Sequence, residues 1–295
     1  VDQLTLHPMN FVEFIRATSG NPLADELLHA NIKLLEPMEQ QLREKLKEYL
    51  LVGGMPEVVS AFVSTKDFSV CRKVQSQIIS DYESDFGKHA PARIQERMRL
   101  VWRSLPGQLA KENKKFIYGV VREGARARDF EESIQWLIDY GIVYRLSRVS
   151  ALRFPFSAYE DTQAFKMFCV DVGLLCALSN LDPSVVLDGS ELFTEFKGAL
   201  TEQYVAQELF GLDQIPVYWS SDRGRAETDF AIENKNQPYP IEVKAGENLR
   251  SKSLKTAMEK FELKRVIRTS LSPYRDEGWL VNIPLWLVGQ YRKLI

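Results

Sequence analysis

The stretch that decides the fold lies in the last third of the chain, where eleven residues separate Thr228-Asp-Phe230 from Glu242-Val-Lys244. The residues around both strings are largely β-formers, and the polar, turn-rich residues 233–238 separate them. This pattern predicts two adjacent strands joined as a hairpin. Alternate residues of a strand share a face, so we expect the Glu242 carboxylate and the Lys244 ammonium to lie side by side.

Two acids and a lysine on such a hairpin are typical of metal-dependent phosphodiesterases. Asp229 and Glu242 supply the hard oxygen ligands that Mg²⁺ prefers, and Lys244 would hold an attacking water or offset charge on the reacting phosphate. Glu202, on a helix expected at 196–210, is the third candidate metal ligand. The alternative is that Glu242 and Lys244 form an ordinary solvated charge pair. A strand flanked by helices is usually central in its sheet, which favours the functional interpretation.

The elements around the hairpin predict an α/β domain. After the helix at 196–210 we expect strands at 217–219, 226–232 and 239–243, then a helix at 249–261 and strands at 265–269 and 278–281. This order, with the four candidate residues, resembles the restriction-endonuclease-like, or PD-(D/E)xK, fold. In that fold a helix acid, a strand aspartate and an E-x-K strand meet at one metal site. The resemblance covers roughly the last third of the chain.

The upstream residues predict two further units. A helical region includes a strong helix at 37–51, which ends at Gly53-Gly54. From residue 114 the outline becomes that of a winged helix, with helices at 116–121 and 128–140 and strands at 142–146 and 165–170. The exposed side of its second helix is acidic, and phosphates would be repelled there. A scaffolding role and a DNA-backbone contact through the wing both stay open, because several arginines surround the unit: Arg126, Arg128, Arg145, Arg148 and Arg153.

Composition excludes several classes of protein. With 295 residues and 45% hydrophobic content, the chain is long enough for two or three domains. A net charge of −2 argues against a protein coated in nucleic acid, although the basic residues between Arg250 and Arg268 are a candidate phosphate-facing patch or, equally, a solvated helix face. Three widely spaced cysteines favour a reducing cytoplasm, and no run approaches eighteen apolar residues, so we expect no membrane contact.

Five strings taken together resemble prokaryotic AAA-type ATPases whose C-terminal half is poorly characterised: Glu48-Tyr-Leu-Leu-Val-Gly-Gly-Met-Pro-Glu57, Gly124-Ala-Arg-Ala-Arg128, Asp171-Val-Gly-Leu174, Lys197-Gly-Ala-Leu-Thr-Glu202 and Tyr239-Pro-Ile-Glu-Val-Lys244. The resemblance implies the end of an ATPase domain at residues 1–18, a helical region at 19–112, a winged helix at 113–187 and a restriction-endonuclease-like domain at 188–295. The chain is thus expected to be a C-terminal piece. No G-x-x-x-x-G-K-[ST] string occurs, so ATP would bind only through the absent N-terminal domain.

Two functions of different class stay open. The first is a Mg²⁺-dependent nuclease-like domain that cuts DNA, with Glu202, Asp229 and Glu242 as metal ligands and with Lys244, Glu242 and Asp229 as catalytic residues. The second is a non-catalytic docking or regulatory module for the ATPase domain of the same parent protein or for a protein partner. The balance of 15 basic against 15 acidic residues from Glu191 onward favours the second, because it steers a polyanion poorly.

Overall fold

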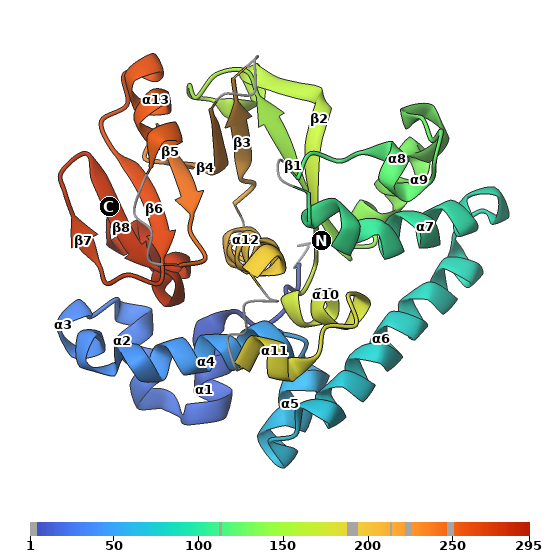
Figure 1. Ribbon diagram of the computed structural model, residues 1–295, viewed down its shortest axis with the longest axis horizontal. Coiled ribbons are helices and arrows are strands. Elements are labelled where there is room, and N and C mark those ends of the chain that lie inside the picture. The colour runs from blue at the N-terminus through green and yellow to red at the C-terminus, as the bar shows by residue number, and fades with distance from the viewer. Residues whose placement is uncertain (1–4, 112–113, 188–193, 213, 222–225, 247–250) are drawn as a thin grey trace, which may run out of the picture.

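One mixed sheet arching around a central helix, α12 (Thr194–Phe210), dominates the molecule (Figure 1). The computed structural model describes residues 5–111, 114–187, 194–212, 214–221, 226–246 and 251–295. Helices α1 to α5 pack below α12 in this view, while α6 and α7 flank the sheet on one side. The predicted α/β fold class is therefore confirmed, as a mixture of helices with one mixed parallel and antiparallel sheet.

The C-terminal elements follow the predicted order. Strand β5 lies between β4 and β6, so the E-x-K strand is central. The short strand β7 and the 3₁₀ helix η4 were not predicted. After α12 the elements are β3 (Val217–Ser220), β4 (Glu227–Asn234), β5 (Gln237–Val243), α13 (Lys252–Phe261), β6 (Val266–Ser270), β7 (Arg275–Asp276), β8 (Leu280–Pro284) and η4 (Leu285–Lys293).

The predicted wing strands extend this same sheet. Strand β1 pairs antiparallel with β2 on one side and parallel with β3 on the other. The strand order is β2-β1-β3-β4-β5-β6-β8-β7, so backbone hydrogen bonds run without a break from the winged-helix outline into the restriction-endonuclease-like strands. The elements of this part are α8 (Tyr118–Val121), α9 (Ala127–Asp139), β1 (Val143–Val149), η2 (Phe156–Tyr159) and β2 (Glu160–Cys169).

The remaining helices contribute to one hydrophobic core that they share with α12 and β2. The helix predicted at 37–51 is α4, displaced by about two residues. All three cysteines are free and buried, and among the described helices none combines the length and apolarity needed to cross a bilayer. The helices are α1 (Phe11–Ser19), α2 (Asn21–His29), α3 (Ile32–Leu35), η1 (Glu36–Met38), α4 (Glu39–Val52), α5 (Pro56–Thr65), α6 (Phe68–His89), α7 (Ala92–Leu109), α10 (Val172–Leu178) and α11 (Pro183–Leu187).

A buried carboxylate joins two of the strings that carry the family resemblance. Asp171, at the N-cap of α10, accepts hydrogen bonds from the backbone nitrogens of Leu174 at 2.9 Å and Gly54 at 2.6 Å. Gln207 of α12 donates to the same carboxylate at 3.2 Å. Glycine is required in the α4–α5 turn because a Cβ on Gly54 would lie 2.1 Å from the Met9 carbonyl oxygen. This junction fixes α10 and α12 against the helical region.

A second buried carboxylate, Glu208 of α12, fastens the first helix and makes stability depend on pH. Its Oε1 accepts a hydrogen bond from the backbone nitrogen of Phe11 at 2.7 Å. Burial, with a smaller contribution from Glu13, raises the pKa of Glu208 to about 7. Because the folded state favours the protonated acid, this group's contribution to stability is complete below pH 4.5 and is lost as the pH rises through 7.

Replacing Glu208 by glutamine is therefore expected to flatten the pH dependence of stability between pH 4.5 and 7. The amide still accepts the Phe11 bond but does not ionise, so the variant should gain on the order of 2–3 kcal/mol relative to the unmodified chain as the pH rises through this window. Denaturant unfolding at half-unit pH steps measures this. Glu44→Gln, at a half-exposed carboxylate, is the matched control, and parallel curves for all three proteins would contradict the prediction.

Candidate functional site

The register of the hairpin brings the predicted acids of its two strands together. Phe230 of β4 pairs with Ile241 of β5, and both side chains are fully buried. The next residues along the two strands, Asp229 and Glu242, are therefore neighbours across the hairpin. The Asp229 carboxylate accepts a hydrogen bond from the backbone nitrogen of Val243 at 2.7 Å, which holds it against the E-x-K strand.

Glu242 and Lys244 lie side by side, as alternation along the strand predicts. The Lys244 ammonium is 2.7 Å from Glu242 Oε1. The Glu242 side chain is 11% exposed, against 31% for Lys244, so the pair is not the solvated charge pair of the alternative interpretation. The second oxygen, Glu242 Oε2, is buried and has no hydrogen-bond partner among the described residues. A buried acceptor of this kind is costly unless another ligand satisfies it.

Glu202 reaches the same region from α12. Burial raises its pKa, and the negative charge of Asp229 raises it further. Lys114 and Lys166 act in the opposite direction. The Lys114 ammonium forms an ion pair with Glu202 Oε1, while Glu202 Oε2 is buried without a hydrogen-bond partner in the part of the chain that the structure describes.

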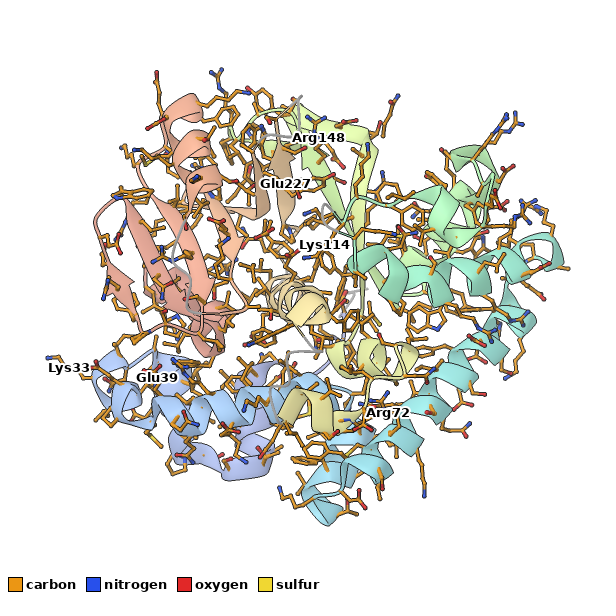
Figure 2. All side chains as sticks on the ribbon, in the orientation of Figure 1. Lys33, Glu39, Arg72, Lys114, Arg148 and Glu227 are labelled. Carbon is orange, nitrogen blue, oxygen red and sulfur yellow. The ribbon has the colours of Figure 1, made fainter. Side chains whose placement is uncertain are left out.

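The structure adds two charged side chains that sequence reasoning missed, Lys166 of β2 and Glu227 of β4. The Lys166 ammonium lies 2.5 Å from Glu227 Oε1 and 4.7 Å from the centre of the Tyr218 ring, with a side chain only 1% exposed. Burial lowers its pKa, but the carboxylates of Glu227, Glu202 and Asp229 outweigh burial, so the pKa is raised. In Figure 2, Glu227 lies on the strands and Lys114 lies below it, toward α12.

A signal for Lys166 was present in the sequence. It is the one charged residue in Phe165-Lys-Met-Phe-Cys-Val170, an otherwise apolar string. Buried lysines are rare unless they are paired, so a lysine in a strand of this kind predicts a buried acidic partner. The identity of that partner was not predictable, because Lys166 and Glu227 are far apart in the chain and meet only through the packing of β1 and β3 between them.

The predicted ligands do not form a single three-carboxylate group. Across the described ranges, no set of three or more His, Cys, Asp or Glu side chains is positioned to hold one metal ion. Asp229 is the neighbour of Glu242 across the hairpin, and its negative charge also acts on Glu202. Glu242 pairs with Arg268 of β6, which in turn pairs with Asn282 of β8. Glu202, by contrast, lies on α12.

The basic residues near α13 do not form one phosphate-facing patch. Arg268 is 2% exposed and donates to Asn282 within the sheet, and burial lowers its pKa. Arg265 forms an ion pair with Asp276, and the Lys260 ammonium lies 5.2 Å from the Trp219 ring. Lys252 and Lys255 are exposed on α13, and Arg250 lies outside the described residues. The exposed basic residues of α13 therefore resemble a solvated helix face more than a phosphate-facing patch.

Two of the five arginines of the winged-helix outline, Arg145 and Arg148, are engaged within the chain, whereas Arg126, Arg128 and Arg153 are exposed. Arg148 bonds to Asp161 of β2 and to Ser220 of β3, so it joins the wing strands to the rest of the sheet. Arg145 donates to the Thr162 carbonyl and packs over Phe165. These contacts are those of a scaffold, and the acidic side of α9 stays exposed at Glu131 and Glu132.

Two protein-domain models match the chain. One is a domain of unknown function, DUF8612, over residues 43–185, and the other is a domain of unknown function, DUF4143, over residues 197–287. The second match contains the four candidate residues, and DUF4143 is found in C-terminal regions associated with AAA-type ATPases. No curated protein and no solved structure matches the chain.

Proposed function

We propose that the last third of the chain is a Mg²⁺-dependent nuclease-like domain that acts on DNA, within the C-terminal region of an AAA-type ATPase. The observation that carries the proposal is the pair of buried carboxylate oxygens, Glu202 Oε2 and Glu242 Oε2, that lack a hydrogen-bond partner among the described residues. Asp229 is the neighbour of Glu242 across the hairpin, and its negative charge raises the pKa of Glu202. Carboxylate oxygens are the ligands that Mg²⁺ prefers in proteins.

The residues present fit Mg²⁺ as a site with few protein ligands. Mg²⁺ is usually held by one or two carboxylates together with waters and substrate phosphates, so a three-carboxylate group is not required. Asp229 with Glu242, or Asp229 with Glu202, provides such a pair. When bound, Mg²⁺ would supply charge neutralisation at the phosphate and a water of lowered pKa.

The protein's own side chains have distinct roles in this proposal. The Glu242 carboxylate holds the Lys244 ammonium at 2.7 Å, and the ammonium offsets negative charge as it develops on the phosphate. Glu202 must lose its proton to bind a cation, and since its pKa is raised, binding weakens as the pH falls. ATP would bind in the N-terminal domain of the parent protein. The DUF4143 match supports a parent protein of the AAA-type ATPase class.

Manganese binding and DNA cleavage by the full chain and two alanine variants test the proposal. We expect calorimetry to show Mn²⁺ binding that Asp229→Ala weakens at least tenfold, because Asp229 belongs to both carboxylate pairs. Lys244→Ala should keep Mn²⁺ binding but lose about 100-fold or more in cleavage of a labelled DNA, the usual effect of removing one charge-stabilising group. Asp139→Ala, on the exposed end of α9, is the control. Unchanged cleavage in Lys244→Ala would remove the catalytic proposal.

A specific observation favours the second function, a docking or regulatory module for the ATPase domain or a protein partner. Glu202 and Glu242 each already have a lysine counter-ion, Lys114 and Lys244, so the described site is close to neutral without a metal. If the unmodified chain shows no saturable binding of Mn²⁺ or Mg²⁺, this module is the better account. The Asp229→Ala variant should then retain its association with the ATPase domain.

A further inference from the structure

A cavity of about 310 Å³ lies between the helical region and α12, outside the carboxylate site. Its volume is at the lower end of the range for small-molecule sites, about 300–1,000 Å³. Side chains of α4 form one wall, those of α12 form another, and Ala245, the residue after Lys244, contributes at the rim. The cavity thus joins the two parts of the chain that match different domain models.

The apolar part of this cavity's lining is mainly aliphatic. Five branched side chains from four different segments contribute to it: Leu46, Leu50, Val186, Leu271 and Leu285. The one aromatic lining residue, Tyr204, uses its hydroxyl to donate to the Leu285 carbonyl at 3.0 Å and packs edge-on against Phe11 and Tyr49. The cavity therefore suits an apolar body of aliphatic shape better than a stacked aromatic base.

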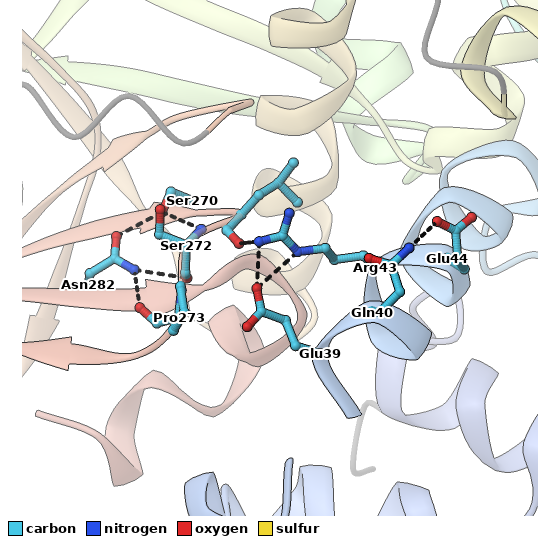
Figure 3. Close-up of polar contacts among 9 residues, drawn as sticks. Glu39, Gln40, Arg43, Glu44, Ser270, Ser272, Pro273 and Asn282 are labelled. Carbon is cyan, nitrogen blue, oxygen red and sulfur yellow. Dashed lines mark hydrogen bonds and ion pairs between the residues drawn. The ribbon is translucent and has the colours of Figure 1, made fainter. Parts of the chain in front are cut away.

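The charged groups of the lining leave one cation in excess. Arg43 is engaged by Glu39 and by the Leu271 carbonyl at 2.7 Å, as Figure 3 shows. Lys47 lies 3.2 Å from Glu44 and also donates to the Leu187 carbonyl. The ammonium of Lys197, by contrast, has no hydrogen-bond or ion-pair partner within the described ranges. One uncompensated ammonium beside an apolar cavity selects a ligand with a single negative charge.

We propose that this cavity binds a small monoanion with an aliphatic body, of the class of medium-chain carboxylates. The carboxylate pairs with Lys197 of α12, and the aliphatic body lies among the leucines, where its burial contributes about 25 cal/mol per Å². Because α4 and α12 form facing walls, the bound anion holds the helical region against the sheet. The site is separate from metal binding and does not depend on the nuclease-like proposal.

Calorimetry of the full chain with octanoate as the probe tests the proposal. We expect saturable binding with one octanoate per chain. Octanamide, which keeps the body and loses the charge, should bind at least tenfold more weakly, and acetate, which keeps the charge and loses the body, should not bind measurably. Equal affinity for octanoate and octanamide, or no saturable binding of octanoate, would overturn the proposal.

Two variants assign the binding to Lys197. Lys197→Met should weaken octanoate binding at least tenfold, while Lys197→Arg, which keeps the charge, should restore it to within about threefold. Lys33→Met, at an exposed lysine on α3 (Figure 2), is the matched control and should bind as the unmodified chain does. Thermal unfolding of each variant shows whether it folds. Unchanged octanoate affinity in folded Lys197→Met would overturn the assignment of the anion to this side chain.

Discussion

Replacing Asp171 by alanine is expected to lower the free energy of unfolding by about 3–5 kcal/mol at pH 7, because each buried donor left without an acceptor costs about 1–3 kcal/mol. Three donors lose this acceptor at once: the backbone nitrogens of Gly54 and Leu174, and the side-chain amide of Gln207, which keeps its second hydrogen bond to the Tyr49 hydroxyl. Those groups belong to the α4–α5 turn, α10 and α12, so a single carboxylate connects three segments. Chemical denaturation, followed by circular dichroism, measures the change.

The control for this variant is Asp139→Ala, at an exposed carboxylate that accepts a hydrogen bond from Gln135 of the same helix. A surface change of this kind usually alters stability by less than about 0.5 kcal/mol. Burial raises the pKa of Asp171 to about 6, so the ionised carboxylate is itself held at a cost. If Asp171→Ala unfolds at the same denaturant concentration as Asp139→Ala, the three hydrogen bonds do not offset that cost and the proposed junction is wrong.

Replacing Lys166 by methionine is expected to cost about 3–5 kcal/mol, the usual effect of removing one partner from a buried ion pair. The methionine keeps the length and apolar stem of the lysine, so the cavity term is small. The loss arises because the carboxylates of Glu227, Glu202 and Asp229 would all lose the positive charge of Lys166, on which each of them acts. Unfolding in denaturant again measures the effect.

A double-mutant cycle separates this electrostatic cost from a packing defect. Adding Glu227→Gln to Lys166→Met removes the carboxylate left without its partner, so the double variant should be more stable than the two single changes predict by addition. Lys255→Met, in a pair more than 60% exposed on both sides and 4.0 Å apart, should change stability by less than about 1 kcal/mol. Strict additivity in the Lys166 cycle would show that packing, not charge, explains the loss.

The elements of the last third were predictable because each depends on neighbours in the chain. The strands at 226–232 and 239–243 have β-forming residues and a polar turn, and they appear as β4 and β5. Alternation along β5 also predicted the contact between Glu242 and Lys244. The pairing of β1 with β3 was not predictable in the same way. No local sequence pattern specifies which of two strands from distant segments will be neighbours in a sheet.

The candidate site shows the same division. The hairpin acids, Asp229 and Glu242, are neighbours because the turn between their strands sets the register. The cations that act on Glu202 come from elsewhere in the chain: Lys114 is 88 residues away, and Lys166 lies on a strand of the winged-helix outline. Their positions depend on how the sheet curves around α12 (Figure 1).

The sequence by itself determined the hairpin, the central position of its E-x-K strand and the order of elements around it, because propensity, alternation and turn chemistry act over a few residues. Tertiary structure alone decided that Lys114 meets the predicted acid Glu202, that Lys166 meets Glu227, and that the wing strands and the C-terminal strands form one sheet. Such contacts are set by burial and by charge pairing between segments that are far apart in the chain. The free energy of those contacts depends on the whole packed core, which no local stretch of residues encodes.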